Sequence, residues 1–220
     1  MIKKLLNKIL DLILPQKCFN CGEDGRVLCE KCIFMLPRNE KYMGRDNIAV
    51  FSYQNNTMKE CVALLKYKKA FSIAEDLGKY LYEIALEEIS EIKIMSDGTR
   101  KDKFILIPVP IHKNRLKSRG YNQAKLLAKE MAKQDKKSFE ILEDVLLKIK
   151  DTESQALREC RKERLKNLKD AFLVKNEHKI KGRTVLLIDD VITTGTTVEE
   201  CRKSLILAGA RKVIALALAH

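Results

Sequence analysis

Long apolar runs, tryptophan and acidic charge are what this sequence of 220 residues has least of. No run of about 18 or more apolar residues occurs, which excludes a helix that spans a membrane. There is no Trp, and aromatic residues make up 6% of the chain, so rings on which unpaired nucleic-acid bases stack are scarce. Acidic residues number 30 against 43 basic ones, and the resulting net charge of +13 favours polyanionic partners.

The N-terminal 15 residues carry lysines followed by leucines, as a signal peptide does. Asn7, Lys8 and Asp11 interrupt the apolar run, however, and no small-residue cleavage site follows. The leucines and isoleucines fall on one helical face, so we predict an amphipathic helix over residues 1–15 that ends at Pro15. Docking on its own domain is the favoured role of this helix, and peripheral contact with a membrane or a partner is the alternative.

Four of the seven cysteines form two C-x-x-C pairs, Cys18 with Cys21 and Cys29 with Cys32. Four thiolates complete the tetrahedral shell of a structural zinc ion, and a redox or iron–sulfur site is the alternative. We therefore predict a zinc-ribbon-like module over residues 16–38 whose folding energy comes from the metal. Such cysteine usage is typical of a reducing compartment, which places the protein in the cytoplasm.

The stretch from Val185 to Glu199 predicts a buried strand, a polar loop and a helix. The strand leads into Asp189 and Asp190, whose natural partners are sugar hydroxyls or Mg²⁺. The loop has a glycine among hydroxyl donors at the start of a helix, which suits a phosphate. Its residues are Thr193, Thr194, Gly195, Thr196 and Thr197. Phosphate and sugar hydroxyls side by side describe a ribose 5-phosphate.

A second strand, loop and helix cover Phe104–Ile107, residues 111–119 and Ala124–Ala132. The basic loop would emerge on the same edge of a parallel sheet, where Lys113, Arg115 and Arg119 could neutralise a pyrophosphate. Further predicted elements are a strand at Ile48–Tyr53, helices at Met58–Tyr67 and Ile73–Ile92, a strand with or without a helical turn at Phe139–Ile149, and a strand entered at Ala171 and Phe172. Lys66–Lys69 is a basic turn, interpreted as a solvated loop or as a loop facing a ligand.

Positive charge is concentrated in two segments of the chain. Residues 111–169 hold 17 of the basic and 9 of the acidic residues, including Arg161 and Arg164. Because these segments should flank the ribose phosphate site, the concentration favours a functional patch over a general lysine bias.

The two acidic residues, two apolar residues and Thr-Thr-Gly-Thr-Thr from Asp189 to Thr197 resemble the phosphoribosyl pyrophosphate (PRPP) motif of type I phosphoribosyltransferases. With the cysteine pairs, Pro108-Val-Pro110, Arg119-Gly-Tyr-Asn-Gln123 and the series from Thr152 to Phe172, the chain resembles the ComF family in its ComFC-type form. The resemblance implies an α/β fold: a parallel-sheet domain of the type I phosphoribosyltransferase kind, with helices on both faces, over residues 46–220. It also implies a pyrophosphate loop at residues 112–119 and a hood over the site that contains Gln155, Arg161 and Arg164.

What this resemblance implies for function is a cytosolic protein that binds PRPP with magnesium and takes part in DNA uptake. As an enzyme it would transfer the phosphoribosyl group to an acceptor that no motif identifies. Asp189 and Asp190 would then hold the ribose hydroxyls, directly or through magnesium, and favour positive charge on the ring. The alternatives are a module that handles single-stranded DNA with the competence machinery, and a catalytically silent sensor of PRPP.

Overall fold

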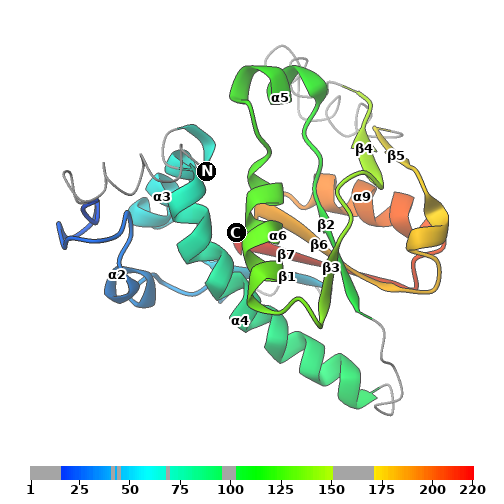
Figure 1. Cartoon of the computed structure of the whole chain (residues 1–220), viewed down its shortest axis with the longest axis horizontal. Coiled ribbons are helices and arrows are strands. Elements are labelled where there is room, and N and C mark those ends of the chain that lie inside the picture. Colours follow the sequence, from blue (N-terminus) through cyan, green and yellow to red (C-terminus); the bar gives the residue numbers. More distant parts are fainter. Residues whose placement is uncertain (1–15, 41–42, 44–45, 68–69, 96–102, 151–170) are drawn as a thin grey trace.

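A five-stranded parallel sheet organises this chain in the computed structural model, which describes residues 16–40, 43, 46–67, 70–95, 103–150 and 171–220 (Figure 1). The elements in chain order are α2 (Glu30–Phe34), β1 (Asn47–Phe51), α3 (Asn56–Tyr67), α4 (Ala70–Met95), β2 (Phe104–Pro108), α5 (Lys113–Arg119), α6 (Gln123–Gln134), β3 (Phe139–Ile141), β4 (Leu146–Lys148), β5 (Phe172–Val174), the short 3-10 helix η1 (Glu177–Lys179), β6 (Thr184–Val191), α9 (Thr196–Leu207) and β7 (Lys212–Ala219). The predicted N-terminal helix and the predicted hood lie outside the described residues.

The strand order of the sheet is β1-β7-β6-β2-β3, and every neighbouring pair is parallel. The central strand β6 is apolar on both faces, as strands covered on both sides of a parallel sheet are. Ile188 of β6 pairs with Pro108 of β2 on one side and with Leu216 of β7 on the other. The ends of β2 and β6 therefore open at the same edge of the sheet.

Two apolar cores lie on opposite faces of the sheet. Alternate residues of β6, such as Leu186, pack with α3, α4 and α6, while its neighbours, such as Leu187, pack with α9 and the β4-β5 hairpin. Figure 1 shows α4 and α6 running side by side, with α9 and the hairpin away from them across the sheet. The predicted fold class, a phosphoribosyltransferase-type sheet with helices on both faces, is confirmed.

The structure corrects three of the predicted elements. The basic stretch after β2 was predicted as a loop, but it forms α5, which begins at His112, whose Nδ1 accepts from the Asn114 N–H at 3.4 Å. The helix ends at Gly120 with a φ of 81°, and Gly120 donates its N–H to Leu116 O. Lysine and arginine have good helix propensity, so two caps suffice to make the stretch helical.

The other two corrections concern strands. The predicted strand over Phe139–Ile149 is two strands in two different sheets, because β3 joins the parallel sheet and β4 pairs antiparallel with β5. The strand before the threonines continues through both aspartates to Val191. The last strand, β7, was not predicted, although its residues are a continuous apolar run. Among the described helices, none is long and apolar enough to cross a membrane.

Candidate functional site

The loops after β2 and β6 meet at the carboxyl edge of the sheet, where parallel sheets place ligands. The Val109 N–H donates to Ile188 O at 2.8 Å, so the chain after β2 stays beside β6 until the aspartates begin. The Asn122 side chain then donates to Val109 O at 2.9 Å and also caps α6 by accepting from the Lys125 N–H. The start of α6 is thereby held at the same edge as the end of β6.

Asp189 and Asp190, which we call the acid pair, lie near the end of β6 that points to this edge. Asp189 Oδ1 accepts from the Asp190 N–H at 2.8 Å, and Asp190 Oδ1 accepts from the Val191 N–H at 3.0 Å. Burial, and then the neighbouring Asp190 carboxylate, raise the pKa of Asp189 well above its ordinary value. The backbone therefore fixes one oxygen of each carboxylate and leaves the other for a partner.

The partner that faces Asp190 is a lysine from another element. Lys66 Nζ, at the end of α3, lies 3.2 Å from Asp190 Oδ2. The orientation of this ion pair leaves Oδ2 buried and without a hydrogen bond from the described residues. The sequence prediction had Lys66 in a basic turn with two interpretations, and the structure places its ammonium against the acid pair.

The threonine loop, residues 193–197, connects β6 to α9. Gly195 has a φ of 75°, a left-handed conformation that favours glycine, and it stands at the N-cap of α9 without a side-chain cap. The hydroxyls of Thr194 and Thr196 lie 2.9 Å apart. The first-turn amides of a 12-residue helix and several hydroxyls thus lie together, which is the arrangement that binds phosphate.

A cavity of about 250 Å³ lies at this edge of the sheet. Six of the predicted site residues line it: Asp189, Asp190, Thr193, Thr197, Arg115 and Arg119. Thr194, Gly195 and Thr196 belong to the loop on its wall, while the predicted Lys113 is exposed at the start of α5 and is not among the lining residues. Gln155, Arg161 and Arg164 lie outside the described residues.

Several lining residues were not predicted from the sequence. Lys148, on β4, comes from the opposite core layer to Lys66, so the two lysines reach the cavity from different faces of the sheet. Gln123, the first residue of α6, is 3% exposed, and its Nε2 has no hydrogen-bond partner among the described residues. A buried amide donor that faces a cavity is suited to donate a hydrogen bond to an oxygen atom of a ligand. The sequence signal of Gln123 was its place at the end of the stretch from Arg119 to Gln123, which carried the family resemblance but no role for this residue.

The chemistry of this cavity fits a ribose phosphate with its magnesium ion. One end offers hydroxyls and helix amides without negative charge, and the middle offers two carboxylates, of which Asp190 Oδ2 is buried without a hydrogen bond from the described residues. Carboxylate oxygens are the protein ligands that Mg²⁺ prefers. Two arginines and two lysines supply positive charge at the other walls, as a pyrophosphate requires.

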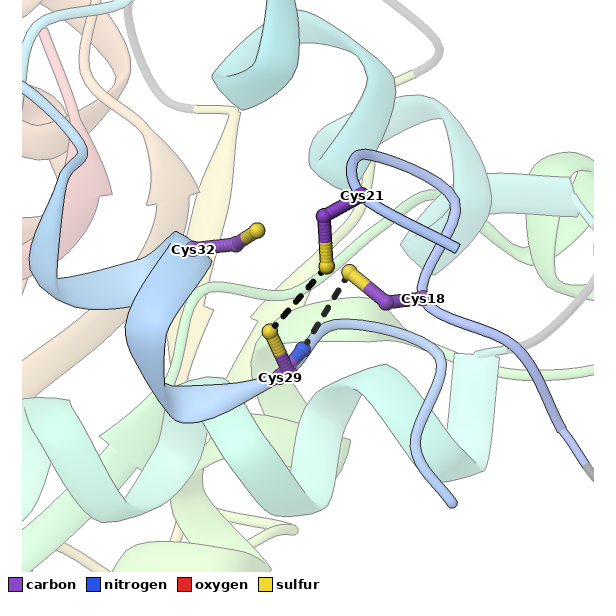
Figure 2. Close-up of side chains that lie close together, drawn as sticks. All are labelled: Cys18, Cys21, Cys29 and Cys32. Atoms are coloured by element: carbon purple, nitrogen blue, oxygen red, sulfur yellow. Dashed lines mark hydrogen bonds between the residues drawn. The ribbon is translucent and has the colours of Figure 1, made fainter. Parts of the chain in front are cut away.

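A second cluster gathers the four predicted cysteines, Cys18, Cys21, Cys29 and Cys32 (Figure 2). Their sulfur atoms all lie within 4.8 Å of one another. Burial raises the pKa of the Cys18 thiol, but backbone N–H groups that donate to its sulfur, the Cys29 N–H first, outweigh burial and lower it to about 6. Four sulfur atoms this close together fit a tetrahedral metal shell.

The cysteine module, residues 16–38, packs directly on α3 and α4. Its residues share one apolar core with Met58 and Leu77. The Arg26 guanidinium, at 2.8 Å, makes an ion pair with Asp76, a carboxylate that is 7% exposed on α4. Burial raises the pKa of Asp76, and the Arg26 charge acts against that rise. The module is therefore fixed to the same helices that cover the sheet.

Comparison with known proteins shows what the chain is similar to. Residues 116–220 match the model of the phosphoribosyl transferase domain. Competence protein F of Haemophilus influenzae is 28% identical over 204 residues, covering 92% of this chain and 84% of its own. Competence protein ComFC of Bacillus subtilis is 28% identical over 208 residues, covering 93% of this chain and 75% of its own.

One further relative is similar in sequence, and the similarity to a solved structure is small. The DNA utilization protein YhgH of Escherichia coli K12 is 28% identical over 68% of this chain and 63% of its own. A Trypanosoma cruzi hypoxanthine phosphoribosyl transferase superposes on 66% of this chain and 64% of its own with 13% identity and a TM-score of 0.40, a partial overlap that adds nothing to the assignment. The chain is thus similar to the ComF-type competence proteins over most of its length, and residues 116–220 match a phosphoribosyl transferase domain.

Proposed function

We propose that this protein binds PRPP with magnesium in the cavity at the carboxyl edge of its sheet and acts in DNA uptake. The observation that supports it most is the joining, in one cavity, of the acid pair, the threonine loop and two arginines of α5. The competence homologues support the role in DNA uptake. The reduced cysteine cluster is consistent with work in the cytoplasm, where thiols stay reduced.

Each part of PRPP has a group suited to it in the proposed complex. The amides of the first turn of α9 and the hydroxyls of Thr193 and Thr197 would donate hydrogen bonds to the oxygens of the 5-phosphate. Asp189 and Asp190 would accept hydrogen bonds from the ribose hydroxyls. Arg115 and Arg119 would face the pyrophosphate, whose charge the magnesium ion neutralises further when it is bound.

If the protein transfers the phosphoribosyl group, the bond between the anomeric carbon and pyrophosphate breaks as a bond to the acceptor forms. Positive charge then develops on the ribose ring, and the acid pair next to the ring would stabilise it. The arginines of α5 would stabilise the negative charge of the leaving pyrophosphate. Catalysis and the role of silent sensor are separated by a turnover assay that follows pyrophosphate release from PRPP over a panel of nucleobases and related acceptors.

Calorimetric titration of PRPP in the presence of magnesium tests the binding. Wild-type protein should bind, and Asp190→Asn should weaken binding by about tenfold or more, because a charged acceptor of hydrogen bonds is worth about 1.5–3 kcal/mol. Asp144→Asn is a matched control, since Asp144 is 65% exposed and pairs with Lys179 far from the cavity. Equal affinity of wild type and Asp190→Asn, or no PRPP binding by either, would reject the proposal.

Single-stranded DNA binding is the second candidate function, and one surface favours it. Phe71, at the start of α4, is 69% exposed and lies beside Tyr121 with 6.0 Å between the ring centroids. Tyr121 stands between Arg119 and Asn122, which both line the cavity. Rings beside cations are the usual platform for unpaired bases.

Fluorescence anisotropy with a labelled oligothymidine tests this second function. The affinity should fall steeply between 50 and 200 mM salt, as phosphate contacts require, and Phe71→Ala should weaken it further through lost stacking of about 1–3 kcal/mol. Leu207→Ala, a truncation of an even more exposed apolar side chain on α9, should leave the affinity unchanged. Affinity that does not vary with salt would exclude this function.

A further inference from the structure

The strongest unassigned feature of the cavity is the position of Lys66. Its ammonium lies 3.2 Å from Asp190 Oδ2, and the two side chains are 27% and 15% exposed, so water screens the pair only in part. Lys148, the other lysine of the cavity wall, lies on β4. The distance of 3.2 Å makes Lys66 a direct ionic partner of Asp190.

The backbone that carries Lys66 is fixed along the whole of α3. Met58, Val62 and Leu65 bury one side of this helix completely in the apolar core. At its start the Thr57 hydroxyl donates to Asn20 Oδ1 of the cysteine module at 3.0 Å. Because Leu65 precedes Lys66 directly, the ammonium reaches the acid pair from a rigid support and not from a mobile loop.

The charges at this point of the site are two carboxylates and one ammonium. Backbone N–H groups already bind one oxygen of Asp189 and one of Asp190, and they orient the carboxylates without removing their repulsion. Lys66 compensates one of the two negative charges. In many carboxylate pairs a divalent cation supplies this compensation, and here a side chain of the protein supplies it.

We propose that Lys66 is a positioning residue that keeps the acid pair able to bind the ribose hydroxyls without a divalent cation. The ammonium holds Asp190 in place and offsets its charge, while Asp190 Oδ2, which has no hydrogen bond from the described residues, accepts from the sugar. This inference rests on the proposed PRPP site. It implies that any magnesium requirement of this protein arises at the pyrophosphate end of the ligand and not at the ribose end.

Ribose 5-phosphate is the probe that separates these two ends, because it carries the hydroxyls and the 5-phosphate but no pyrophosphate. Calorimetric titrations would compare wild type, Lys66→Met and Lys66→Arg in EDTA and in magnesium. Wild type should bind with affinities that agree within about twofold in the two buffers. Lys66→Met should bind at least tenfold more weakly in EDTA and recover with magnesium, and Lys66→Arg should behave like wild type.

Two controls separate the loss of the Lys66 charge from a general effect of replacing a lysine on α3. Lys59→Met changes an exposed lysine of the same helix and should match wild type in every titration. Magnesium titrated alone into Lys66→Met should show tighter binding than into wild type, since the acid pair then lacks its ammonium. Wild-type binding of ribose 5-phosphate that requires magnesium, or Lys66→Met that is unaffected in EDTA, would overturn the role of Lys66.

Failure of the proposed function gives a different pattern. If wild type binds neither PRPP nor ribose 5-phosphate, the PRPP site is refuted. The titration of magnesium alone then decides whether Lys66 compensates the acid pair, because that measurement needs no sugar. Equal magnesium affinity of wild type and Lys66→Met in that case refutes the compensation as well.

Discussion

Gly78→Ala is expected to destabilise the protein although alanine is the better helix former. Gly78 is buried in α4, and a Cβ at this position would lie 2.5 Å from the Cβ of Glu130 and 3.4 Å from Leu127 O on α6. Two effects of opposite sign meet here. Alanine adds about 1 kcal/mol of helix propensity, while overpacking of a tight contact costs about 1–3 kcal/mol.

The contact cannot be relieved by a side-chain rotation, because Glu130 Cβ is fixed to its backbone and the helices must separate. We therefore expect overpacking to win, with a net loss of about 1 kcal/mol in the free energy of unfolding and a lower Tm by about 2–4 °C. Since α6 carries Asn122 and Gln123 at the cavity, a shift of this helix should also weaken PRPP binding.

Urea denaturation followed by far-UV circular dichroism measures the stability, and calorimetry measures the binding. Ser90→Ala is the control on the same helix, where the side chain is exposed, so the gain in helix propensity of about 0.5 kcal/mol is set against one exposed hydrogen bond to Leu86 O, and stability should stay nearly equal. Glu130→Gly removes the clashing atom and should make the Gly78→Ala effect smaller in the double variant. A Gly78→Ala protein as stable as wild type would refute the argument.

Three further changes test other parts of the molecule. In Gly195→Ala the added Cβ meets no atom within 4 Å, but the residue must keep a φ of 75°. The free energy of unfolding in urea should therefore fall by about 1 kcal/mol and PRPP binding should weaken, while Gly195→Asn should lose less. An Ala variant equal to wild type would contradict this. For Glu143, burial raises the pKa but hydrogen bonds from Lys125 and Lys129 outweigh it and lower the pKa. Glu143→Gln should therefore cost about 0.5 kcal/mol at pH 7, fading as the pH falls through the lowered pKa, and a loss that persists at pH 2 in urea denaturation would speak against the pairing. Cys32→Ser should reduce zinc content from one ion per chain to none by emission spectrometry, and unchanged zinc would exclude the four-sulfur site.

The elements that the sequence predicts best are those whose apolar pattern meets no competing signal. The strand before the acid pair is one, because Val185 to Ile188 are buried on both faces and nothing polar interrupts them. The basic stretch after β2 was interpreted from its charge, whereas helix propensity and the caps at His112 and Gly120 decided its structure. The last strand was available from its continuous apolar residues and was missed.

The residues of the site likewise fall into two groups, those that a local sequence pattern predicts and those that it does not. The acid pair and the threonine loop are local in sequence, so residue order alone places them together. Lys66, Gln123 and Lys148 reach the cavity from α3, α6 and β4, and only the packing of these elements on the sheet brings them there. Their meeting depends on contacts between distant segments, which no local pattern records.

The β4-β5 hairpin has a consequence for the wall of the cavity. The Ile149 N–H donates to Ala171 O at 2.8 Å, which extends the antiparallel pairing of Lys148 with Phe172 by one residue. The backbone on both sides of Lys148 is therefore held by the partner strand. The lysine that lines the cavity from this face of the sheet thus stands on a paired strand and not on an unsupported connection.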